Sequence, residues 1–197
     1  MTVPIKPFFN NRILGAIAII GAPMLLISFL LNATDSEAPK TLRDQLFSLA
    51  GFFYILGWMA GAVGMRQLRA TGRRLGSKIV FVIQMVFLGL ALIFSTMEVM
   101  GYSGTDRNLL FAVTDLGYPL SHLFMLVVGI FTVRADVWKG VSKVAPFIVG
   151  LALPVTLGLW RINAARFGLI LFGILTMLGL GIIGLTVWKS SSTAHEN

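Results

Sequence analysis

Residues 79–101 read IVFVIQMVFLGLALIFSTMEVMG, and this stretch decides the fold class. The charged residue before it is Lys78, and the next one along the chain is Glu98. An α-helix needs about 20 apolar residues to cross the hydrocarbon core of a bilayer. The stretch therefore predicts a transmembrane helix.

The same spacing of charges recurs along the rest of the chain. Only 12% of the 197 residues are charged, whereas a soluble domain of this size carries about 25%. The other long uncharged gaps run from Arg12 to Asp35, Asp44 to Arg66, Asp115 to Arg134, Lys143 to Arg161 and Arg166 to Lys189. These gaps predict an all-α bundle of six transmembrane helices over residues 13–31, 46–65, 79–101, 109–133, 144–160 and 167–188.

The distribution of lysine and arginine predicts the orientation, because cytoplasmic loops collect positive charge. With the N-terminus inside, the cytoplasmic side holds Lys6, Arg12, Arg66, Arg69, Arg73, Arg74, Lys78, Arg134, Lys139, Lys143 and Lys189. The other side holds Lys40, Arg43, Arg107, Arg161 and Arg166. We therefore expect both termini in the cytoplasm, with residues 1–12 as a cytoplasmic segment, 13–188 as one membrane domain and 189–197 as a polar tail. A multi-pass protein of a bacterial inner membrane is the predicted localisation.

The most basic stretch, residues 66–78, reads RQLRATGRRLGSK. We interpret its charge as a topology signal that also contacts anionic lipid head groups. A dedicated effector site is the alternative. Since the positive charge is explained by topology, no nucleic-acid partner is expected.

Small residues recur at helix-packing spacing in the predicted second helix. Gly57, Gly61 and Gly64 lie on one face of it, and small residues let helix backbones approach closely in lipid. These glycines predict tight packing, either within one chain, between copies in a homo-oligomer or in a larger membrane complex. The lipid bilayer itself is the other expected partner.

A polar cluster is the candidate functional site. Ionisable residues inside a membrane are costly, at about 2.5 kcal/mol or more for Asp at a helix centre. Asp115, Tyr118 and His122 are spaced i, i+3, i+7, which places them on one helix face, and Glu98 lies near the end of the preceding helix. These four residues predict a ligand- or proton-binding site that opens outward between helices three and four.

The counter-ions of this predicted site would be Arg161 and Arg166, from the outer loop between helices five and six. The alternative interpretation of the cluster is structural. Asp115 would then brace a helix broken by Pro119, and His122 would donate one hydrogen bond between helices. Both interpretations stay open at this point.

Several classes of membrane protein are disfavoured by the residues they need. The chain has no cysteine and only two histidines, which is too few for histidine-rich metal shells. No metal or cofactor is predicted, and no catalytic motif is recognised. We expect a ligand-binding or transport-like protein, with a proton link as one form of it, and the alternative is a non-catalytic accessory or scaffold subunit.

Overall fold

A computed structural model describes residues 9–31, 42–102 and 109–190, and these ranges contain no β-strand. Their eight helices are α1 (Asn11–Gly21), α2 (Met24–Leu31), α3 (Leu42–Gln67), α4 (Leu75–Val99), α5 (Leu109–Asp115), α6 (Gly117–Ala135), α7 (Val141–Arg161) and α8 (Ala165–Lys189). They form six segments long and apolar enough to cross a membrane. The prediction of an all-helical, six-segment, membrane-compatible chain is confirmed. Most of the predicted terminal segments lies outside the described residues.

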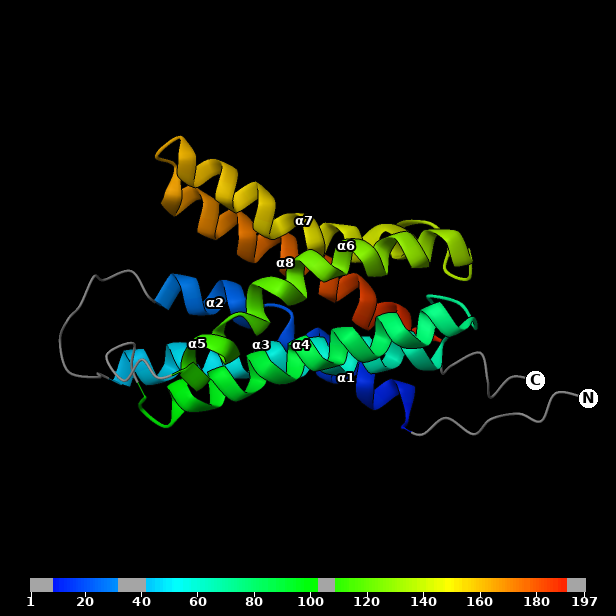
Figure 1. The fold of residues 1–197 in the computed structure, drawn as a ribbon, viewed down its shortest axis with the longest axis horizontal. Helices are drawn as coiled ribbons and strands as arrows, with labels where there is room; N and C mark the ends of the chain where they lie inside the picture. Colours follow the sequence, from blue (N-terminus) through cyan, green and yellow to red (C-terminus); the bar gives the residue numbers. More distant parts are fainter. Residues whose placement is uncertain (1–8, 32–41, 103–108, 191–197) are drawn as a thin grey trace, which may run out of the picture.

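Two of the six segments are broken near a proline (Figure 1). Pro23 lies between α1 and α2, and Pro119 lies in the first turn of α6. Proline lacks an N–H, and its ring clashes with the carbonyl four residues earlier. For Pro119 that carbonyl belongs to Asp115, the last residue of α5. Pro154 differs, because α7 continues past it.

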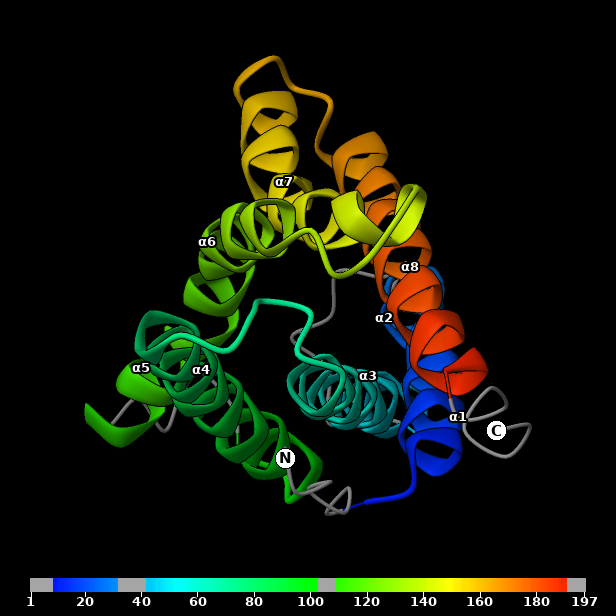
Figure 2. The ribbon, with the colours of Figure 1, turned by 90° about the vertical axis from the view of Figure 1, so that its right-hand side faces the viewer.

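The six segments form a closed ring, which Figure 2 shows from one end. Each segment packs on its neighbours in the sequence, and α8 returns to pack on α1. Helix α3 packs on α1, α2, α4 and α8 and has the largest buried share of the six. Its central residues therefore supply much of the core.

The predicted packing glycines of α3 face other helices of the same chain. A Cβ atom on Gly57 would lie 2.7 Å from the Cα atom of Gly21 in α1. Cβ atoms on Gly61 and Gly64 would lie 3.3 Å and 2.6 Å from side chains of α8. At Gly57 only a residue without a side chain allows the observed approach of α1 and α3.

The two ends of the bundle differ in charge. The start of α1, the end of α8 and the α3–α4 and α6–α7 connections lie together, on the right in Figure 1. We call this the basic end, because the described residues there include Arg66, Arg69, Arg73, Arg74, Lys78, Arg134, Lys139, Lys143 and Lys189. The opposite end, where α7 turns into α8, is called the far end. With six segments, the start of α1 and the end of α8 lie at the same end of the bundle (Figure 1), and the assignment of that end to the cytoplasm stays a prediction.

Candidate functional site at the centre of the bundle

His122 lies at the middle of the segment Leu109–Ala135 and is fully buried. Its Nδ1 lies 3.0 Å from the backbone oxygen of Tyr118, and its Nε2 lies 3.2 Å from the hydroxyl oxygen of Tyr54. A carbonyl oxygen can only accept a hydrogen bond, so these partners assign the proton to Nδ1. Nε2 of the neutral imidazole is then an acceptor, and the Tyr54 hydroxyl donates to it.

Three helices surround the imidazole and its partner Tyr54, each through a pair of residues one helical turn apart. Spacing of i, i+4 places two side chains on the same helix face. The pairs are Tyr54 and Trp58 on α3, Tyr118 and His122 on α6, and Phe172 and Thr176 on α8. The ring of His122 lies 4.5 Å from that of Trp58 and 4.8 Å from those of Tyr118 and Phe172, between centroids. The histidine is therefore packed on several sides by aromatic rings.

Polar atoms near this histidine are buried without a hydrogen-bond partner among the described residues. They are the Tyr118 hydroxyl, the Trp58 Nε1 and both amide atoms of Gln84 on α4. A buried polar group without a partner costs about 1–3 kcal/mol. Such groups in native proteins call for an explanation in a bound water, an ion or a function.

A small cavity continues from Trp58 toward the basic end. Its lining includes Trp58, Gln84, Thr71 and Arg66, and its volume is about 20 Å³. That is room for about one water molecule. Arg66 lies eight residues beyond Trp58 on α3, about 12 Å along the helix axis. Polar groups thus follow one another from the centre of the bundle to its basic end.

The structure places the four predicted site residues in different surroundings. His122 lies in the core and Tyr118 packs against it as a partly buried side chain, and Glu98 on α4 is half-buried and within electrostatic range of Tyr118. Asp115 is exposed. Only Leu116 separates α5 from α6, and its backbone stays in the α-helical region, with φ −60° and ψ −23°. The difference is one of cover, because Asp115 is exposed whereas the ring of Tyr118 packs against the core.

The two predicted counter-ions, Arg161 and Arg166, are exposed at the turn between α7 and α8. Helix α5, which carries Asp115, packs mainly on α4 and α6. Figure 1 shows the α7–α8 turn well apart from α5 at the far end. The structure does not bring these arginines and Asp115 into one group.

Sequence reasoning missed the residues that other helices bring to His122. Tyr54, Trp58, Phe172 and Thr176 are buried, with at most 4% of each exposed. The sequence does carry a signal for them. In both α3 and α8, an aromatic residue is followed four residues later by a second residue that is aromatic or can form a hydrogen bond. Gln84 was visible as an amide in the middle of an apolar helix.

The described residues hold no group of three histidine, aspartate or glutamate side chains that could bind a metal ion. Comparisons of the chain with protein-family models, with curated proteins and with solved structures found no match.

Proposed function

We propose that this chain is a proton-linked ligand-binding or transport-like membrane protein centred on His122. The observation that carries the proposal is a fully buried imidazole in the middle of the bundle, hydrogen-bonded to Tyr54 and close to buried polar atoms without partners among the described residues. An ionisable residue inside a membrane bundle marks a functional site by default, because its burial is costly.

A path for protons or for a small polar solute needs polar groups along its length. Such groups extend from His122 toward both ends of the bundle. Toward the far end, Tyr118 is followed by Glu98. Toward the basic end, Trp58 is followed by Gln84 and the small cavity. We assign the far-end route to the outward opening that the sequence predicts between its third and fourth membrane segments, which are α4 and α5–α6.

Protonation of His122 would change contacts among three helices. A proton on Nε2 turns this nitrogen into a donor, so the Tyr54 oxygen must accept and its own hydrogen needs another acceptor. Thr176 on α8 is the polar side chain beside the Tyr54 hydroxyl. One proton would therefore alter the contacts of α3, α6 and α8 together.

The two broken segments support a transport-like role. Transport proteins often build their sites near the membrane midplane from interrupted helices, where short half-helices can move. Here α1 and α2 are separated near the middle of their segment, and the α5–α6 break lies about two turns from His122. The small cavity admits nothing larger than water, so passage of a solute requires movement of such half-helices.

The first experiment follows the protonation of His122 directly. The chain has two histidines, His122 and His195, so His195→Asn leaves one histidine signal in a protein labelled at that residue. In lipid nanodiscs scanned from about pH 3.5 to 8, we expect the His122 imidazole to change its protonation state, and Tyr54→Phe to alter that change. A histidine that keeps one protonation state in the folded protein over this range would refute the proton-linked role.

The second experiment looks for the ligand. Native mass spectrometry of the protein released from mild detergent would compare the wild type with His122→Asn. Asp115→Asn is the matched control, because it changes an exposed group outside the buried cluster. The proposal expects a small-molecule adduct that is lost in His122→Asn and retained in Asp115→Asn. Equal adducts in all three proteins would contradict a site at His122.

The accessory or scaffold role is the second candidate, and one observation favours it. Gly51, Gly89, Gly158 and Gly181 have open space where a Cβ would stand, so each could admit a helix of another chain. A stoichiometric protein partner in the same spectra, lost when leucine replaces Gly158 or Gly181, would support this role. It would also reassign the His122 cluster to the fold.

A further inference from the structure

A second pocket lies at the basic end, away from His122. It is formed where α4 begins and α6 ends, and its volume is about 380 Å³. Its lining includes Arg74 and Arg134, the hydroxyl-bearing Thr71 and Ser77, and the ring of Phe131. Both arginines are exposed, so their guanidinium groups are available to a ligand.

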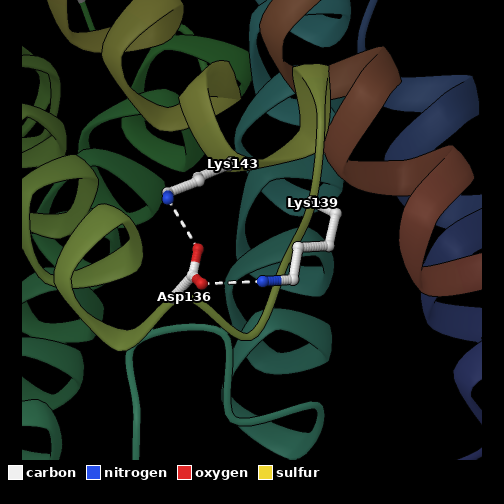
Figure 3. Close-up of polar contacts among 3 residues, drawn as sticks. All are labelled: Asp136, Lys139 and Lys143. Atoms are coloured by element: carbon white, nitrogen blue, oxygen red, sulfur yellow. Dashed lines mark hydrogen bonds and ion pairs between the residues drawn. The ribbon is translucent and has the colours of Figure 1, made fainter.

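The arginines of this pocket have no carboxylate partner among the described residues. Asp136 is the acid that the described part of the basic end contains. Figure 3 shows it held by Lys139 at 2.7 Å and by Lys143 at 2.6 Å. Hydrogen bonds from Lys139 and then Lys143 keep the pKa of Asp136 at about 2. The aspartate is thus committed to the two lysines, and the positive charge of Arg74 and Arg134 is left uncompensated.

The backbone around the pocket is fixed by hydrogen bonds. The Thr71 and Ser77 hydroxyl oxygens lie 2.6 Å apart, and Ser77 donates to the backbone oxygen of Gly72 at 2.9 Å. Gly72 has a φ of 92°, which favours glycine. The turn is therefore a defined structure that presents Arg74 at the start of α4, where no acidic side chain lies in the first turn.

We propose that this pocket binds a phosphate group through Arg74 and Arg134. Two guanidinium groups suit phosphate, because each offers parallel N–H donors to its oxygens. The phosphate could belong to an anionic phospholipid or to a soluble phosphate compound. Exposed apolar residues continue from the pocket along the membrane-facing surface, Ile79 on α4 and Ile130 and Val133 on α6. These residues can contact acyl chains, which favours the lipid.

The experiment measures lipid and phosphate binding by native mass spectrometry in mild detergent. The lipid probe is phosphatidic acid, compared with phosphatidylcholine, and the soluble probes are orthophosphate and glycerol 3-phosphate. The test variant carries Arg74→Gln and Arg134→Gln. The control variant carries Arg73→Gln and Lys78→Gln, which remove the same charge at the same end from residues outside the pocket lining. Both must keep the wild-type melting temperature in phosphatidylcholine.

We expect the test variant to raise the dissociation constant of phosphatidic acid at least about tenfold, or about 1.4 kcal/mol. The control should change it less than about threefold, because exposed charges away from the phosphate are screened. Binding of the soluble probes with the same dependence on Arg74 and Arg134 also supports the site and names a soluble source. Equal losses in both variants, or no phosphate-dependent binding to the wild type, would overturn the proposal. If the test variant alone melts lower, the single change Arg134→Gln is compared with Arg73→Gln by the same criteria.

Discussion

One added methyl group at Gly57 tests the packing of α1 on α3. A Cβ atom there would lie 2.7 Å from the Cα atom of Gly21 and 3.1 Å from the backbone oxygen of Ile17. Both contacts involve backbone, so no side-chain rotation can relieve them. Ordinary contact begins at 3.4 Å, and the two helices must therefore separate by about 0.7 Å. A gap of about 0.5–1 Å already forfeits a quarter to a half of the dispersion energy at an interface.

Gly51 provides the matched control, because it lies on the same helix and its Cβ position is open. Alanine is favoured over glycine in a helix by about 1 kcal/mol, and this gain is common to both variants. Overpacking costs about 1–3 kcal/mol. We therefore expect Gly57→Ala to be less stable than Gly51→Ala by about 1–3 kcal/mol.

The assay is reversible unfolding in mixed micelles, with helix content and tryptophan fluorescence as independent probes. Both substitutions are the same chemical change on one helix, so the difference between their unfolding free energies isolates the contact with α1. Equal free energies would refute the close approach of α1 and α3. A second check is Gly21→Ala, whose Cβ would lie 2.6 Å from the Cα atom of Gly57 and which should be destabilising to a similar degree.

Two further predictions concern hydrogen-bonded side chains. Tyr54→Phe leaves Nε2 of His122 without its donor and should lower the free energy of unfolding by about 1–3 kcal/mol. Tyr118→Phe removes a hydroxyl that has no partner among the described residues and should cost less; equal losses would contradict the assigned hydrogen bond. Lys139 and Lys143 lower the pKa of Asp136 from 3.8 to about 2. The contribution of Asp136 to stability should therefore be complete above about pH 4 and be lost as the pH falls through 2. Melting temperatures over this range should show a smaller pH dependence in Asp136→Asn, and an unchanged dependence would count against the ion pairs.

The six segments could be predicted from the sequence because the bilayer fixes the length of a crossing helix. Charges are excluded from that length, so the gaps between them mark the helices. The breaks were harder to predict. Pro23 and Pro119 separate helices, whereas Pro154 lies within a continuous helix. The loss of one N–H is the same in all three cases, and the tertiary surroundings decide whether the helix continues.

The site was predictable only along a single helix. The i, i+4 spacing of Tyr118 and His122 places them together whatever surrounds them. Their partner Tyr54 is 68 residues from His122, and its position depends on the rotation and depth of a different helix. Asp115 shows the opposite difficulty, because its spacing from Tyr118 does not tell whether another helix covers that side of the segment, and Asp115 is exposed.

The enclosure of His122 also has a consequence for biosynthesis. Tyr54, His122 and Phe172 come from α3, α6 and α8, and α8 packs on α1, α2, α3 and α7. If the six segments cross a membrane as proposed, synthesis from the N-terminus brings the histidine into it before the helix that covers one of its sides. Until α8 inserts, the imidazole faces lipid or another protein on that side. Insertion of α8 both closes the ring of helices and completes the site, so a chain stopped after α7 should be a substrate for membrane quality control.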